Sequence, residues 1–170
     1  MRTAALIAAV GLAAPLGFAA RSQALSLSQT VPCSASVHRA RFPYLGDPGY
    51  RYRLVLGAVS VPPAYLRQVI ATGNRPWRYW HEAGLVVRAS GQAVTVSVLR
   101  AWRARVAITW GNTGIVHSLR IAGCGHDPSQ GNAYAGGLYL RSTSACVPLV
   151  FSVGTRSSTV RFGVGRRCSR

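Results

Sequence analysis

Few residues of this 170-residue chain can carry acid–base chemistry. The only carboxylate side chains are Asp47, Glu82 and Asp127. His126 directly precedes Asp127, and a histidine oriented by a carboxylate is half of a catalytic triad. The sequence has no G-x-S-x-G elbow to supply a nucleophile, and Asp-Pro is an ordinary turn pair. A secreted hydrolase with a loop site around His126 and Asp127 is therefore an alternative, and a plain turn is the preferred interpretation.

Other catalytic patterns are incomplete. His81 and Glu82 open a HEAGL segment, which lacks the second histidine of a zinc-protease helix. A two-carboxylate glycosidase would have to draw on the three acids, which are expected instead to pair with arginines. The chain has no phosphate loop, dinucleotide fingerprint or calcium loop. The sequence favours a non-enzymatic protein, and neither a cofactor nor a metal ion is expected.

The formal net charge of +17 is the strongest indication of a partner. All 20 basic residues are arginines, which bind phosphate and carboxylate groups in bidentate fashion. A field of this sign attracts wall polymers, acidic glycans and, non-specifically, nucleic acids. A solvated surface without a partner is the alternative. Arginines expected on polar strand faces, where neighbouring strands would align them in rows, are Arg51, Arg53, Arg105, Arg120, Arg141 and Arg161.

Aromatic residues provide a second candidate surface. Trp77, Tyr79 and Trp80 form the most aromatic stretch of the chain, and Tyr134 and Tyr139 follow later. Together they form a candidate stacking platform for sugar rings or bases. In a strand, Trp77 and Tyr79 share one face and Trp80 lies on the other. Packing in the core, or over the edge of a sheet, is the alternative role.

The amino terminus predicts export. Residues 4–20 form an uncharged, mostly apolar run, and Ser22-Gln23-Ala24 fits a signal-peptidase site. We expect a signal peptide over residues 1–24, cleaved after Ala24, with a retained anchor as the alternative. Its removal takes away two arginines and leaves 18 against three acids, a net charge of +15. No later stretch is long and apolar enough to span a membrane.

Four cysteines in an exported chain predict two disulfides. Three pairings are possible, and we favour Cys124–Cys146 with Cys33–Cys168, which would join the two ends of the mature chain. The alternative is a metal site. No two cysteines have C-x-x-C spacing, so a disulfide pair is favoured over metal ligands.

Period-two patterns predict the elements that carry these residues. The best pattern runs from Cys146 to Cys168, where two alternating segments flank a break at residues 154–157. Further strands are expected at 50–60, 84–89, 93–99, 104–110, 115–122 and 138–141. Residues 84–99 are expected to form a hairpin, 64–70 a short helix and 123–137 an irregular segment. The result is an all-β, sandwich-like domain of about eight antiparallel strands over residues 50–170, after an extension at 25–49.

Several segments resemble those of small exported proteins from high-GC bacteria to which no function is assigned. They are RYRLVLGAVSVPPAYL, AGLVVRA, RAWRARVAITWG, NAYAGGLYLRS and ACVPLVFSVG. The resemblance implies a secreted, β-rich, disulfide-linked domain and brings no site residues. The leading hypothesis is a secreted, surface-associated binding domain for anionic extracellular partners. A protein–protein interaction module is a further alternative to the hydrolase.

Overall fold

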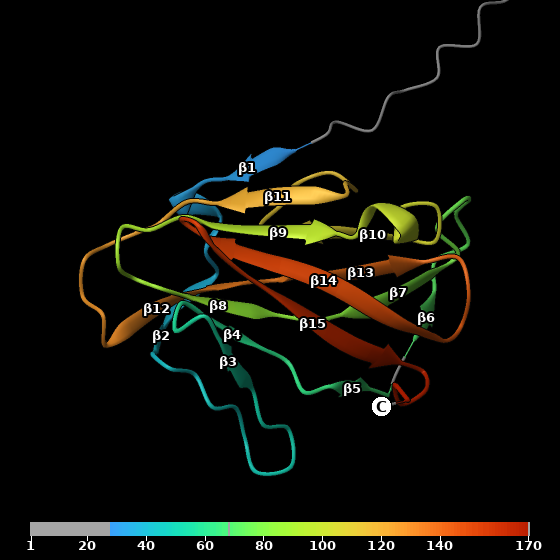
Figure 1. Cartoon of the computed structure of the whole chain (residues 1–170), viewed down its shortest axis with the longest axis horizontal. Helices are drawn as coiled ribbons and strands as arrows, with labels where there is room; N and C mark the ends of the chain where they lie inside the picture. The colour runs from blue at the N-terminus through green and yellow to red at the C-terminus, as the bar shows by residue number, and fades with distance from the viewer. Residues whose placement is uncertain (1–27, 68, 170) are drawn as a thin grey trace, which may run out of the picture.

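The computed structural model describes residues 28–67 and 69–169, and this part of the chain is almost entirely β-structure (Figure 1). The expected all-β, sandwich-like class is confirmed. The described residues form fifteen strands, many of them short, and two single-turn 3-10 helices, η1 at Cys33–Ala35 and η2 at Arg100–Trp102. The expected signal segment lies outside the described residues.

One layer is a six-stranded sheet with the order β1-β11-β9-β14-β15-β5. The long hairpin expected between Cys146 and Cys168 forms its centre, and each of its two strands is nine residues long. The two edge strands, β1 and β5, pair in parallel with their neighbours. The bounds are β1 Gln29–Val31, β11 Ser118–Ile121, β9 Val94–Val98, β14 Ala145–Val153, β15 Arg156–Val164 and β5 Tyr65–Leu66.

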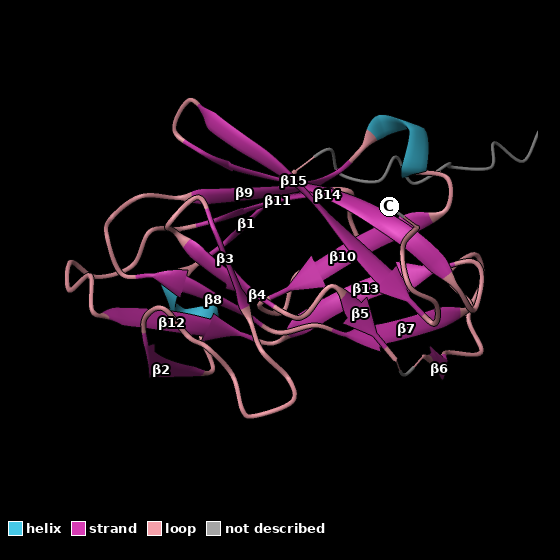
Figure 2. Cartoon of the chain, turned by 60° about the horizontal axis from the view of Figure 1, so that its bottom comes forward, coloured by secondary structure: helices cyan, strands magenta, loops and turns pink. Residues whose placement is uncertain are grey.

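Two smaller sheets form the opposite layer (Figure 2). The four-stranded sheet contains β10 Val106–Trp110, β13 Gly136–Leu140, β7 Tyr79–Glu82 and β6 Ile70–Ala71, in that order. The five-stranded sheet contains β2 His38–Arg41, β12 Gln130–Tyr134, β8 Leu85–Arg88, β4 Val59–Val61 and β3 Arg53–Val55. Only Ala83 and Gly84 separate β7 from β8, and Ala135 alone separates β12 from β13, so the two sheets are halves of one bent layer.

The core lies between the layers because alternate residues of each strand point inward. Val147, Leu149, Phe151 and Val153 of β14 are buried as expected. They pack with inward residues of the opposite layer, including Trp110. The indole Nε1 of Trp110 donates a hydrogen bond to the Ala83 carbonyl oxygen (2.7 Å) at the bend of that layer. A buried Trp with a satisfied N–H therefore fixes the point at which β7 passes into β8.

Residues 84–99 do not form the expected hairpin. β8 pairs with β12 and β4 in one layer, and β9 pairs with β11 and β14 in the other. The turn at Gly91 (φ +71°) instead carries the chain across the sandwich. The true hairpin lies in the expected strand 50–60, where Leu56 and Gly57 both have positive φ (53° and 67°) and join β3 to β4. Two consecutive residues with positive φ are typical of a tight hairpin turn.

The expected helix at 64–70 is wrong, and β5 and β6 occupy this region. The Gly163 and Gly165 amides donate hydrogen bonds to the carbonyls of Ala64 and Leu66 (2.7 and 2.9 Å), which extends the six-stranded sheet. Leu66 is fully buried. Periodicity alone cannot separate a short apolar run in a helix from one in a strand, and here the free sheet edge decides.

Two other segments are more regular than expected. Residues 29–31 and 38–41, expected in an amino-terminal extension, form β1 and β2 and complete two sheets. The segment 123–137, expected to be irregular, contains β12, an inner strand of the five-stranded sheet that pairs with β2 and β8. Gly131 faces Val86 there so closely that a Cβ would come within 2.7 Å of its side chain. Polar and small residues hid this strand from the alternation pattern.

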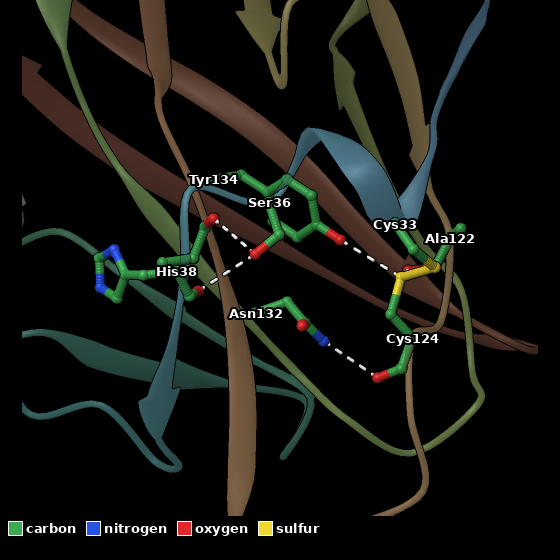
Figure 3. Close-up of a disulfide and its surroundings, with 8 residues drawn as sticks. Cys33, Ser36, His38, Ala122, Cys124, Asn132 and Tyr134 are labelled. Carbon is green, nitrogen blue, oxygen red and sulfur yellow. Dashed lines mark hydrogen bonds between the residues drawn. A yellow bond between two sulfur atoms is a disulfide. The ribbon is translucent and has the colours of Figure 1, made fainter.

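Both disulfides are present, but the favoured pairing is wrong. Cys33 pairs with Cys124, and Cys146 pairs with Cys168. Cys33 and Cys124 lie where β1 and β11 have ended and the chain crosses to the opposite layer, so the bond joins two neighbouring crossovers (Figure 3). Cys146 pairs across the hairpin with Gly163, and the carboxyl terminus folds back over that glycine to bring Cys168 alongside.

Candidate functional site

The outer face of the four-stranded sheet carries an exposed aromatic pair. β7 places Trp80 directly opposite Tyr139 of β13, and their ring centroids are 4.6 Å apart at 45°. The alternate residues of β13, Leu138 and Leu140, are buried in the core, so Trp80 and Tyr139 lie on the opposite, solvent side. Both side chains are partly exposed. We call this pair the aromatic platform.

A glycine gives the platform its shape. Gly137 lies one position along β13 from Leu138, on the same outer face as Tyr139, and pairs with Glu82. A Cβ at this position would lie 2.9 Å from the Trp80 Cη2 atom and 2.0 Å from the His81 carbonyl oxygen. The indole therefore extends over the space that a side chain would fill. Aromatic cover of a sheet glycine leaves a broad ring surface parallel to the strands.

Three arginines border one end of the platform. Arg141 donates its backbone N–H to the Arg105 carbonyl (3.2 Å), one step beyond the last pair of β10 and β13. The same extension of the register between β13 and β7 places Arg78 on the other side of Arg141. All three are exposed, and none forms a salt bridge with a carboxylate in the described part of the chain. This arginine row is a local concentration of positive charge.

Aromatic rings support the arginine row. The guanidinium carbons of Arg141, Arg105 and Arg78 lie 5.7, 5.7 and 5.8 Å from ring centroids. The rings belong to Trp77, Trp102 and Tyr79, respectively. These distances are within the range of cation–π attraction. The contacts restrict the arginine side chains, and all three residues remain exposed.

The other end of the platform carries the opposite charge. Glu82 follows Trp80 on the outer face of β7, and Ile70 of β6 lies beside Trp80, with 53% of its surface exposed. Ile70 and Glu82 line a hollow of about 310 Å³ together with Tyr50, Arg67 and His81. A second hollow of about 280 Å³ adjoins the arginine row at Arg75 and Arg78. The surface is therefore polar at both ends and aromatic in the middle.

Only part of the expected stacking group lies on this surface. Trp77 is 6% exposed and packs edge-to-face against His117, and Tyr134 is 1% exposed. The Tyr134 hydroxyl lies 3.4 Å from the Cys124 Sγ, and burial raises the pKa of this tyrosine. Tyr79 lies on the core side of β7. Trp77 and Tyr134 are therefore packed inside the fold, the alternative role given above, whereas Tyr79 is partly exposed and also lines the hollow beside Arg78.

Among the described strands, the expected arginines align in a row only at this sheet. Arg53 packs its guanidinium 5.0 Å from the Phe162 ring centroid and donates a hydrogen bond to the Pro62 carbonyl (3.3 Å). Burial lowers its pKa. Arg51 is exposed ahead of β3. On the six-stranded sheet, Arg120 lies opposite Thr95 of β9, and Thr95 lies opposite Ser152 of β14. No second arginine therefore lies beside Arg120 across these strands.

The loop around His126 is a turn. The Asp127 carboxylate accepts hydrogen bonds from the backbone N–H and the hydroxyl of Ser129 (2.9 and 2.6 Å), which lower its pKa. No hydrogen bond connects Asp127 with His126 in the described chain, and both are exposed. Within residues 28–67 and 69–169, no three His, Cys, Asp or Glu side chains cluster as metal ligands would.

Sequence reasoning missed a cluster of three tyrosines near Glu82. Tyr44, Tyr50 and Tyr52 lie in the loop before β3, and their rings contact one another. The alternation of Tyr50 and Tyr52 was visible in the sequence. Their proximity to Glu82, thirty residues later, was not, because it depends on the bend between β7 and β8.

Neither the family models nor the curated proteins that were compared contain a match to this chain. No helix among the described residues has the length and apolar character needed to cross a membrane.

Proposed function

We propose that this protein is a secreted, non-enzymatic binding domain for acidic glycans, with the outer face of the four-stranded sheet as its contact surface. The observation that carries the proposal is the partly exposed Trp80–Tyr139 pair beside a row of three arginines. Aromatic rings offer apolar faces to the C–H side of a sugar, and guanidinium groups bind carboxylate or sulfate substituents.

Export is supported by two independent features. The amino-terminal sequence has the pattern of a signal peptide, and all four cysteines are joined in disulfides. Disulfides form and persist in oxidising compartments outside the cytoplasm. The ligand is accordingly an extracellular polymer.

Glu82 favours a glycan over a nucleic acid. This carboxylate lies beyond Trp80 on the same face, at the end opposite the arginine row. A polyphosphate backbone passing across the platform would meet a like charge there. A sugar instead presents hydroxyl groups, which donate hydrogen bonds to a carboxylate. The proposed ligand therefore has its acidic substituent at the arginine end and neutral hydroxyls near Glu82.

The test compares wild type with Trp80→Ala and Arg141→Gln by isothermal titration calorimetry against a uronic-acid polymer, a sulfated glycan and single-stranded DNA. Binding seen only at 50 mM salt indicates general electrostatic attraction, whereas binding that persists at 300 mM salt indicates a shaped site. Loss of a stacked ring costs about 1–3 kcal/mol, so Trp80→Ala should weaken glycan binding by about 5- to 150-fold. Loss of a charge-assisted hydrogen bond costs about 1.5–3 kcal/mol, so Arg141→Gln should weaken it by at least about 10-fold.

Arg120→Gln is the matched control, because it removes the same charge from the exposed face of the other layer. It should change affinity less than about twofold at 300 mM salt. Equal losses for Arg120→Gln and Arg141→Gln, or unchanged binding by Trp80→Ala, would refute the platform. Tighter binding of DNA than of either glycan at 300 mM salt would support the nucleic-acid alternative.

A further inference from the structure

A second feature of the surface lies beyond the glycan platform, at the tyrosine loop. The Tyr44 and Tyr52 rings meet edge to face, with centroids 4.8 Å apart at 80°. Tyr50 and Tyr52 also meet at a steep angle, 69°, with centroids 6.0 Å apart. The rings pack directly on one another at steep angles and form a continuous aromatic wall.

The loop that carries these rings is fixed by its own backbone. The Tyr44 N–H donates to the hydroxyl of buried Ser60, and the Tyr52 N–H donates to the Leu45 carbonyl, both at 3.0 Å. Gly46 (φ +72°) lies so close that a Cβ would come within 2.3 Å of the Tyr50 carbonyl oxygen. The tyrosines are therefore held in place before any ligand arrives, which reduces the entropic cost of binding.

Tyr44 and Tyr52, but not Tyr50, line an open cavity of about 190 Å³. At about 30 Å³ per water, it has the volume of about six water molecules, enough for a five-heavy-atom group such as tetramethylammonium. Its lining combines aromatic, acidic and apolar groups, including His38, Tyr44, Tyr52, Glu82, Gly84 and Leu85. The Gly84 position approaches the Tyr52 hydroxyl, since a Cβ there would lie 3.4 Å from it.

Glu82 gives the cavity its charge. It lines this cavity and also the neighbouring hollow with Tyr50. Burial, followed by the negative charge of Glu82, raises the pKa of Tyr50. Burial, then the neighbouring Tyr50 and Tyr44 and lastly Glu82 raise the pKa of Tyr52 to about 12. Arg67 shares the neighbouring hollow, yet neither it nor any other described cation forms a salt bridge with Glu82. The same holds for Asp47 and Asp127 in the described part of the chain, so the expected pairing of the three acids with arginines is wrong there, and Glu82 differs from the other two in lining a cavity.

Aromatic faces and an unpaired carboxylate attract the same kind of ligand. The ring quadrupole is negative at its face, so an alkylammonium group against the tyrosine rings gains cation–π attraction, strongest when water is excluded. We propose that the cavity formed by Tyr44, Tyr52 and Glu82 binds an organic ammonium cation, either a quaternary ammonium head group or a primary amine. The net positive charge of the chain opposes this only weakly, because the Debye length is about 8 Å at physiological salt.

The experiment uses the disulfide-bonded chain at 150 mM salt and follows binding by calorimetry and by chemical shifts of the tyrosine rings. The probes are choline, its neutral carbon isostere 3,3-dimethylbutan-1-ol, and ethylammonium. Choline or ethylammonium should bind with millimolar affinity, at least about 10-fold tighter than the neutral isostere. Whichever cation binds more tightly identifies the head group. Equal affinity for the isostere would mean an apolar pocket and would overturn the proposal.

Variants distinguish the effect of the Glu82 carboxylate on cation binding from the effect of the overall charge of the chain. Glu82→Gln should weaken cation binding by at least about fivefold. Asp47→Asn, which makes the same charge change in the tyrosine loop without lining the cavity, should leave cation affinity within about twofold. Tyr52→Phe retains the ring and should retain binding, whereas Tyr52→Leu should lose it. Equal effects of Glu82→Gln and Asp47→Asn, or no cation binding by wild type at 50 mM ligand, would refute the site.

This site and the glycan platform can fail separately. Trp80→Ala removes the platform and should leave choline or ethylammonium binding unchanged, because Trp80 does not line the cavity. Tyr52→Leu removes a cavity wall and should leave glycan binding unchanged. Loss of both activities in Trp80→Ala would contradict the assignment of two sites.

Discussion

The disulfide pairing makes a quantitative prediction about stability. In the chain-entropy model, a cross-link stabilises the fold by limiting the unfolded chain, and its effect increases with the length of the closed loop. Cys33 and Cys124 are 91 residues apart, and Cys146 and Cys168 are 22 apart. These separations correspond to about 4.6 and about 3.4 kcal/mol at 25 °C. The double variant C33A/C124A should therefore be the less stable one, by about 1 kcal/mol.

The contacts around the sulfur atoms act in the same direction. Cys124 is buried, and its Sγ lies 3.4 Å from the hydroxyl of fully buried Tyr134. In C33A/C124A this hydroxyl loses its sulfur neighbour, which adds to the entropic loss. Cys168 is partly exposed at the end of the chain, so C146A/C168A leaves no comparable group behind. Total stability of a domain is about 5–15 kcal/mol, so either loss is a large part of it.

The assay is equilibrium urea unfolding of wild type and both double variants without reductant, monitored by tryptophan fluorescence. Similar m-values would show that the three proteins expose similar surface on unfolding. Non-reducing proteolysis of wild type, which should give a fragment joining the Cys33 and Cys124 peptides, verifies the pairing directly. A larger loss in C146A/C168A than in C33A/C124A would refute the loop-length reasoning, and a fragment joining Cys33 to Cys168 would refute the pairing.

Three further predictions concern the site and its supports. Gly137→Ala should displace Trp80 and destabilise the fold, because the added Cβ would lie 2.0 Å from the His81 carbonyl oxygen. The expected results are a shifted Trp80 emission and a lower midpoint of urea unfolding. A midpoint equal to that of the wild type would contradict the prediction. Burial lowers the pKa of His117, so stability should be complete above about pH 6.5 and fall on acidification through the lowered folded-state value. His117→Gln should remove that dependence in thermal unfolding at pH 5 and 8, and an unchanged slope would contradict the assignment. Tyr52 should ionise at about pH 12 in an ultraviolet titration. The stability that it contributes is therefore present below about pH 10 and lost between about pH 10 and 12. A difference between wild type and Tyr52→Phe that titrates with a midpoint near pH 10 would contradict this.

The sequence predicted the elements that depend on local interactions better than those that depend on contacts between distant parts of the chain. The hairpin β14–β15 was predictable because its alternation is long and its turn local, and Val147 through Val164 take the expected faces. The expected helix at 64–70 and hairpin at 84–99 are wrong because β5, β8 and β9 pair with strands from later parts of the chain. The predicted disulfide pairing was wrong for the same reason, because residue spacing does not encode which crossovers lie side by side in a sandwich.

The candidate site shows the same limit at the level of single side chains. Period two correctly separated Trp80 from Trp77 and Tyr79, but it could not tell which face is solvent, since that depends on the opposite layer. Gly137 resolves the ambiguity, because its missing side chain leaves room for the Trp80 indole outside the core. A glycine opposite an acidic residue and beside an aromatic pair is invisible to alternation, yet it decides that this sheet presents a ring to solvent. A search for exposed platforms in β-rich sequences should therefore weigh strand glycines together with the aromatics that flank them.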